Sequence, residues 1–232
     1  MNHIFIYHIE KRKTMSTSVR NKITQIYKSR MNILNILESV YGYDISDYSG
    51  FSINEIDAMV ANDQLDMLLT HRNGEDGETT VPIHKTYIKY ATSGTMNTSM
   101  ITTIVDDLFS MSDTLTSKDC LCIIYNGEPN DTITNYLNYI YEQSQTFVVI
   151  HNLARLQFNI LEHSLVPKVN IMTEKEIEDL KKQYVVDSMS QFPEISRYDP
   201  QALAICLRPG QMCKVLRNSP TSMVTPYYRV CV

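Results

Sequence analysis

The chain has 232 residues, 43% of them hydrophobic and 20% charged, which is ordinary for a globular protein and predicts one or two domains with a real core. Its net charge of −5 is unevenly spread, since residues 1–30 carry +6, residues 31–157 carry −12 and residues 158–232 carry +1. A free-standing nucleic-acid binder usually has a basic face, so the acidic middle argues against strong autonomous DNA binding.

Two further features concern the compartment. The five cysteines are an odd number in a chain too large to need disulfides, which favours reduced thiols inside a cell. No apolar run approaches the length of a membrane span. Residues 1–14 have basic residues after a short apolar patch, the wrong order for a signal peptide, so we expect a dispensable extension with Met15 as a possible start.

The first part of the chain predicts helices. Apolar residues near helical spacing predict a long amphipathic helix over residues 17–41, ended by Gly42. Ser52 and Glu55 have capping-box spacing and open a second helix.

A loop, a strand and a helix are expected next. Residues 71–80 hold two glycines and three acids, which predicts a mobile loop. Residues 81–90 predict a strand, and residues 101–108 have the spacing of a helix.

The next stretch has an α/β rhythm. Leu121 to Tyr125 is a continuous apolar run, as expected of a strand buried on both faces. Asp131 is expected to cap a following helix, and Phe147 to Ile150 to form a second strand. Strand, helix, strand predicts a parallel pair joined by a crossover helix. We expect a further strand over Gln157 to Leu161.

The last part predicts a separate α+β module. Thr173 and Glu176 repeat the capping-box spacing, and Asp199-Pro200 is a cap followed by a first-turn proline. Met212 to Leu216 and Tyr227 to Val232 predict strands.

Signals for catalysis or metal binding are weak. Cys120 and Cys122 alternate on one strand, but no second pair of ligands has metal-site spacing, so buried structural thiols are expected. The histidines, including His84 and His151, have no triad pattern. The glycines are isolated and form no phosphate loop. We therefore expect no catalytic residue, no metal and no cofactor.

Residues 160–232 carry a family motif with specific order and spacing. The residues that match are His163, Leu165, Val166, Pro167, Pro193, Ile195, Asp199, Pro200, Gly210, Lys214, Arg217, Ser219, Thr221, Tyr228 and Arg229. In this stretch the chain resembles subunit 5 of the eukaryotic nuclear RNA polymerases and the corresponding small subunit of archaeal RNA polymerase. Cys206 and Met223 stand where the family usually has glycine, and Val169 where it commonly has a second histidine.

The resemblance implies an architecture of two domains. Residues 15–157, which match more weakly, would form an α/β domain resembling a restriction endonuclease without an active site, a domain that the archaeal subunits lack. Residues 158–232 would form the small α+β polymerase-assembly domain. The N-terminal sequence agrees with a missing active site, because its expected strands at 81–90 and 121–125 carry no Asp…Glu-x-Lys arrangement.

The resemblance also implies a role and partners. The chain would be a non-catalytic polymerase subunit that binds the largest subunit and neighbouring small subunits, and forms part of the lower jaw. Asn126, Pro129 and Asn130 line up with a family loop near downstream duplex DNA, which the chain would contact indirectly. No membrane and no small-molecule substrate are implied.

The resemblance also bears on the source and place of the chain. Its divergence would suit a protist or a large DNA virus, hence the nucleus or a viral factory or virion. Two alternatives stay open: a free-standing transcription cofactor that uses the same module, and a nuclease-like enzyme.

Overall fold

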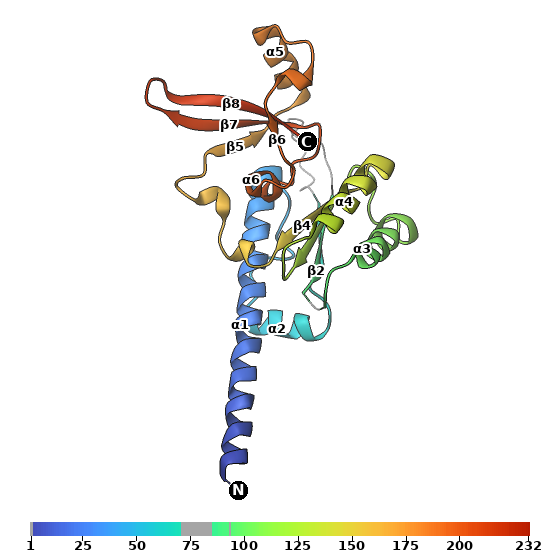
Figure 1. The fold of residues 1–232 in the computed structure, drawn as a ribbon, viewed down its shortest axis with the longest axis vertical. Helices are drawn as coiled ribbons and strands as arrows, with labels where there is room; N and C mark the ends of the chain where they lie inside the picture. The colour runs from blue at the N-terminus through green and yellow to red at the C-terminus, as the bar shows by residue number, and fades with distance from the viewer. Residues whose placement is uncertain (1, 71–84, 93) are drawn as a thin grey trace.

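The computed structural model describes residues 2–70, 85–92 and 94–232, with side chains from residue 20 onward. The described elements form two units, each built on a four-stranded sheet (Figure 1). The mixed α/β content with a distinct C-terminal α+β module agrees with the predicted fold class at this level.

The N-terminal unit is a three-layer sandwich. Its sheet has the order β1-β2-β3-β4, with β1–β2 antiparallel and the other two pairs parallel. The strands are β1 (Met67–Leu69), β2 (Thr86–Ala91), β3 (Cys120–Tyr125) and β4 (Phe147–Asn152). The helices are α1 (Asn2–Tyr41), α2 (Ile53–Ala61), α3 (Thr98–Val105), which continues as the π-helical η1 (Asp106–Met111), and α4 (Asp131–Ser144).

The sheet is covered on both faces because β3 and β4 are apolar on both. Cys122 and Val149 pack into one core with α1 and α2. Leu121 and Val148, which point the other way, pack into a second core with α3 and α4. The predicted parallel pair joined by a crossover helix is confirmed, with β3 and β4 in parallel register and α4 between them.

The C-terminal unit packs a second sheet between two groups of elements. The order is β5-β7-β8-β6, in which only the β6–β8 pair is parallel. The strands are β5 (Lys168–Ile171), β6 (Glu194–Ile195), β7 (Met212–Ser219) and β8 (Met223–Cys231). The helices are α5 (Glu174–Tyr184), the 3₁₀ turn η4 (Met189–Gln191) and α6 (Pro200–Ala204).

Each face of this second sheet has its own small core. Met212 and Val230 pack with Leu180 of α5 on one face. Cys213 and Val215 pack with α6 on the other, where Val40 near the end of α1 joins them. Figure 1 accordingly shows α6 beside the C-terminal end of α1. The two units therefore share apolar contacts along this face.

Several predicted features are confirmed. Both capping boxes are formed, with Glu55 Oε2 accepting from the Ser52 amide at 2.7 Å and Glu176 Oε2 accepting from the Thr173 amide at 2.8 Å. Asp199 caps α6, with Pro200 in the first turn. Gly42 follows α1 with φ of 69°, a left-handed conformation that suits glycine at a helix end.

Other predictions need correction. Residues 157–161 form no strand: the segment has two 3₁₀ turns, η2 (Arg155–Gln157) and η3 (Ile160–Glu162). Of the apolar residues there, Leu161 packs against the C-terminal core, whereas Phe158 is 55% exposed. The cap of α4 is Asn130, whose Oδ1 accepts from the Ile133 amide at 2.9 Å, whereas Asp131 is the first helical residue.

The remaining differences concern boundaries. α1 begins at Asn2, well before residue 17, and β8 begins four residues before Tyr227. The strand expected at 81–90 appears as β2 from Thr86, and residues 81–84 lie outside the described part. The expected loop at 71–80 also lies outside the described residues.

Candidate interface of the C-terminal module

The entry loop of the module presents an exposed leucine. His163 organises the loop, since its Nδ1 accepts from the Leu165 amide at 3.2 Å and its carbonyl accepts from the Val166 amide at 2.9 Å. Gln201 of α6 donates to the Pro167 carbonyl at 2.6 Å and ties the end of the loop to the module. Leu165 itself is 85% exposed. The motif therefore fixes a loop whose apolar side chain faces outward.

A second group of motif residues holds the module together. The Pro193 carbonyl accepts from the Val230 amide at 2.9 Å beside the short strand β6. Asp199 Oδ1 accepts from the Gln201 amide at 2.9 Å and starts α6. Arg229 donates from Nη1 to the Glu194 carbonyl at 2.9 Å, which links β8 to β6. These residues have structural roles, although Pro193 is exposed and Asp199 and Arg229 are half-buried.

The β7–β8 hairpin carries the rest of the motif. Lys214 faces Tyr228 across the two strands. The Arg217 guanidinium lies 5.0 Å from the centre of the Tyr227 ring. Gly210, in the turn before β7, has φ of 85° and donates to the Cys231 carbonyl at 2.9 Å. The conformation explains why glycine occupies this position.

The hairpin turn is built on short side-chain contacts. Thr221 donates from its amide to Ser219 Oγ at 3.4 Å, and the two hydroxyls lie 3.2 Å apart. Met223 follows with φ of 57° and pairs across the turn with Ser219. A glycine, which the family usually has here, would adopt this backbone without strain. Methionine instead adds an apolar side chain at the tip and strains the backbone locally.

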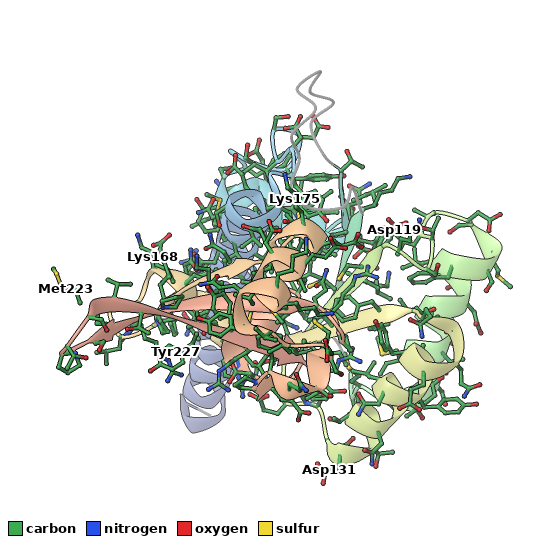
Figure 2. The ribbon with its side chains drawn as sticks, turned by 90° about the horizontal axis from the view of Figure 1, so that it is seen from above. Asp119, Asp131, Lys168, Lys175, Met223 and Tyr227 are labelled. Atoms are coloured by element: carbon green, nitrogen blue, oxygen red, sulfur yellow. The ribbon has the colours of Figure 1, made fainter. Side chains whose placement is uncertain are left out.

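Exposed apolar side chains gather on this module. The large apolar residues of residues 158–232 that are at least 45% exposed are Phe158, Leu165, Tyr184, Val185, Met223, Val224, Tyr227 and Val232. Met223 is 85% exposed and lies at the free end of the hairpin, pointing away from the rest of the molecule (Figure 2).

Sequence reasoning missed most of these surface residues. It singled out Leu165 but not Met223, Val224 or Tyr227 as candidates for contact, because a strand prediction does not say where the hairpin leaves the core. The departure at Met223 was the available signal, since methionine in place of a turn glycine costs local energy and adds apolar surface.

The loop predicted to lie near DNA, residues 126–130, lies in the N-terminal unit and not beside the hairpin. Asn130 caps α4, and Gly127 lies so close to the Tyr125 ring that an added Cβ would be 2.7 Å from Cε1. Glu128 Oε1 accepts from Asn152 Nδ2 at 2.8 Å and from Arg155 Nε at 3.0 Å. The loop carries an acid, and Asn126, Glu128 and Asn130 in it are exposed. In both figures α4, which starts at Asp131, lies apart from the hairpin tip.

Two arginines that both contact the Phe147 ring help to join the two units. Arg197 is buried and donates from Nη2 to the Val148 carbonyl at 2.9 Å, while its Cζ lies 5.3 Å from the Phe147 ring centre. The Arg208 guanidinium lies 4.9 Å from the same ring centre. Its Nη2 donates to the carbonyls of Lys118 and Asp119. These contacts orient the C-terminal module against β4.

Tyrosines add to this junction. The hydroxyl of the half-buried Tyr41 donates to the Ile205 carbonyl at 2.7 Å, and loss of solvent around it raises the pKa of Tyr41 well above its usual value. Tyr198 donates to Asn138 Oδ1 of α4 at 2.7 Å, and Tyr141 to the Pro209 carbonyl at 3.2 Å. Each is a bond between a side chain of one unit and the backbone or side chain of the other.

The described residues offer little for other kinds of site. No group of three or more His, Cys, Asp or Glu among them is placed to hold a metal ion. No helix in the described part of the chain is long and apolar enough to cross a membrane. The five cysteines are buried and free.

A small module with exposed apolar side chains on a projecting hairpin is typical of a protein that assembles with other polypeptides. Residues 158–231 match the family model described as RNA polymerase Rpb5, C-terminal domain. The chain belongs to this family of RNA polymerase subunits, as the motif residues predict.

Named relatives agree with this family. The DNA-directed RNA polymerase subunit Rpo5 of Thermococcus kodakarensis is 40% identical over 79 residues, which cover 34% of this chain and 95% of the relative. Rpo5 of Pyrococcus abyssi gives the same figures. The subunit RPABC1 of RNA polymerases I, II and III from Caenorhabditis briggsae is 40% identical over 79 residues, 37% of its own length.

Proposed function

We propose that this chain is a non-catalytic subunit of a multisubunit DNA-directed RNA polymerase. The observation that carries the proposal is the match of residues 158–231 to the Rpb5 C-terminal domain, with relatives named as polymerase subunits. The archaeal relatives support a role for this module in particular, because 79 residues of this chain cover 95% of the Thermococcus kodakarensis protein.

The proposed anchor is the C-terminal module on the largest polymerase subunit, with neighbouring small subunits nearby. Leu165 and Met223 are each 85% exposed, and exposed apolar side chains gain free energy when a partner removes them from water. The motif residues that bond within the module, such as Asp199 and Arg229, would then act by holding this surface in shape. The proposed location is inside the cell, in the nucleus or, for a virus-encoded chain, in a viral factory or virion.

The proposed place of the N-terminal unit is the lower jaw, with downstream duplex DNA reached indirectly. A mixed sheet with helices on both faces suits the proposed restriction-endonuclease-like fold without an active site. Because residues 31–157 carry a net charge of −12, phosphate repulsion should make binding of free DNA weak and strongly salt-sensitive. A cross-linker at Asn130 that fails to reach DNA in the assembled enzyme would remove the loop assignment.

Purification of the tagged chain from its own cells tests the proposal. The two large polymerase subunits should co-purify in equal amounts with it. Substoichiometric recovery would favour the alternative of a free-standing transcription cofactor. Magnesium- or manganese-dependent DNA cleavage by the purified chain, lost on changing an acid in residues 31–157, would favour the nuclease-like alternative.

Matched variants locate the contact. Met223→Asp and Leu165→Asp should each lower co-purification of the large subunits at least several-fold, because a charge would enter an apolar contact. Met111→Asp is the control, since Met111 is 81% exposed and lies at the end of η1 in the N-terminal unit. An equal loss from Met111→Asp, or no loss from the other two, would contradict the proposed anchor.

A further inference from the structure

A cavity lies where the two units meet. It has a volume of about 650 Å³ and is lined by β4, α4, the turn η2, and the segment from Arg197 through α6. β4 is an edge strand of the N-terminal sheet, so the cavity runs along an edge that no other described strand covers. Ligand sites occur preferentially at such boundaries between domains, and this volume is in their usual range.

Most of the cavity wall is apolar. Ile150, Leu156, Leu203 and Leu207 contribute from four different elements or loops. An apolar cavity of this kind favours an apolar occupant, because water gains few hydrogen bonds there. The wall therefore selects for hydrocarbon or aromatic groups.

One cation is placed in this apolar setting. Arg197 is 6% exposed, and its Cζ lies 5.3–5.5 Å from the ring centres of Tyr141, Phe147 and Tyr198. Its side-chain hydrogen bond uses Nη2 only, and the ion pairs among the described residues do not include it. Nε and Nη1 have no hydrogen-bond partner among the described residues. Neither atom is fully enclosed, so both remain accessible. A nearly buried guanidinium with unused donors suits an anion.

The other polar groups of the wall leave this charge uncompensated. Glu128 is engaged by Arg155 at 3.0 Å and by Asn152 at 2.8 Å. His151 is buried, and burial, then the charge of Arg155, lowers its pKa to about 4, so it is neutral at pH 7. Arg197 is consequently the cation that a ligand would meet in the apolar part of the cavity.

We propose that this cavity binds a small apolar carboxylate, with the hydrocarbon along the β4 edge and the carboxylate on Arg197. The molecule would be a bound ligand and not a substrate. The carboxylate would accept from the guanidinium donors that the protein leaves unused. An extended peptide added to the β4 edge is disfavoured, because Arg197 already occupies the Val148 carbonyl.

Calorimetric titration of the full chain with decanoate, decan-1-ol and decylamine tests the head-group choice. Decanoate should bind at least about tenfold more tightly than the alcohol, and the cationic amine should bind most weakly. Methyl-labelled protein should show shifts at Ile150 and Leu203, both of which line the cavity. Equal binding of acid and alcohol, absence of binding at millimolar decanoate, or shifts confined to the exposed hairpin would each overturn the proposal.

A variant pair assigns the effect to one side chain. Arg197→Gln should reduce the acid-to-alcohol preference to less than about threefold, with alcohol binding retained. Arg217→Gln is the control, because Arg217 is an exposed arginine on β7 that also lies over a tyrosine ring. If Arg197→Gln does not fold, the head-group comparison and the methyl shifts on the unaltered chain still decide the matter. If folded Arg197→Gln keeps the full preference for decanoate over decan-1-ol, the assignment of the carboxylate to Arg197 is wrong.

Discussion

Arg197 donates a hydrogen bond from Nη2 to the carbonyl oxygen of Val148 at 2.9 Å, across the boundary between the two units. The bond caps the free edge of β4 and fixes the start of α6 beside the N-terminal sheet. Arg197 and Arg208 also both contact the Phe147 ring. These two side chains therefore help to set the relative position of the units.

Loss of Arg208 should uncouple the two units. Arg208→Ala removes hydrogen bonds to the carbonyls of Ser117, Lys118 and Asp119 and the contact with the Phe147 ring. We expect a loss of about 2–3 kcal/mol of stability and a second unfolding transition in calorimetry. A single unchanged transition would show that the junction rests on apolar contacts alone. Arg229→Ala, which affects a bond inside the C-terminal unit, should leave the transitions coupled.

Glycine should be favourable at the hairpin tip. Met223 has φ of 57°, a conformation that costs a non-glycine residue about 1–2 kcal/mol, against about 0.5–1 kcal/mol of extra chain entropy lost by glycine. Met223→Gly should therefore stabilise the isolated chain by about 0.5–1 kcal/mol in urea unfolding. Met111→Gly, at an equally exposed helical position, should destabilise it. Destabilisation by both would argue against strain at Met223.

Cys206 should show the same backbone strain as Met223, but at a buried position. It has φ of 47°, is 3% exposed and packs in the core shared with α1. Cys206→Ala keeps the strained backbone and loses the thiol, whereas Cys206→Gly loses more side chain but relieves the strain. The glycine variant should be as stable as the alanine variant or up to about 1 kcal/mol more stable. An alanine variant clearly more stable than the glycine variant would mean that packing decides this position.

His151 should make the fold sensitive to mild acid. Its pKa is lowered to about 4 by burial and by Arg155, against about 6.5 in the unfolded chain. Above pH 6.5 both states are neutral, and as the pH falls from 6.5 to 4 only the unfolded state takes up the proton. Stability should fall by up to about 3 kcal/mol over this window.

His151→Leu isolates this effect. The variant also removes a buried Nε2 that has no partner in the described structure, so it should fold at pH 7.5. Its stability should decrease less than that of the unaltered chain between pH 7.5 and 5, measured by urea unfolding. Equal decreases would assign the acid sensitivity to other groups.

The chain end should be essential for the module. β8 pairs with both β7 and β6, and the Arg197 amide donates to the Val232 oxygen at 2.8 Å. Deleting residues 227–232 removes these bonds and the buried Val230 and Cys231, at about 1.5–3 kcal/mol for each large side chain. Circular dichroism should show loss of the module. Deleting residues 1–14 should leave it unchanged, and a folded 227–232 deletion would contradict this account.

The sequence predicts the elements that rest on local chemistry. Thr173 and Glu176 specify a helix start through two reciprocal bonds, and the apolar run from Leu121 specifies a strand buried on both faces. Residues 157–161 have an apolar spacing too, but they form 3₁₀ turns in which Leu161 packs against the C-terminal core and Phe158 is 55% exposed, and only tertiary structure supplies those surroundings. Periodicity does not distinguish a strand from a packed turn over so short a segment.

The candidate site residues were predictable only in part, because motif spacing identifies positions but not their surroundings. Motif spacing identifies His163, Asp199 and Gly210, whose roles are a loop bond, a helix cap and a left-handed turn. It cannot tell these structural positions from exposed ones such as Met223. The junction residue Arg197 has no local signal at all, because its partners Val148 and Phe147 lie about fifty positions away in the chain.

The most direct test of the central claim is a pull-down of the largest polymerase subunit with fragments 160–232 and 15–157, each checked for folding. The fragment 160–232 should retain the subunit about as well as the chain 15–232, and 15–157 should retain little. Retention by folded 15–157, with none by folded 160–232, would contradict the assignment of the C-terminal module as the anchor.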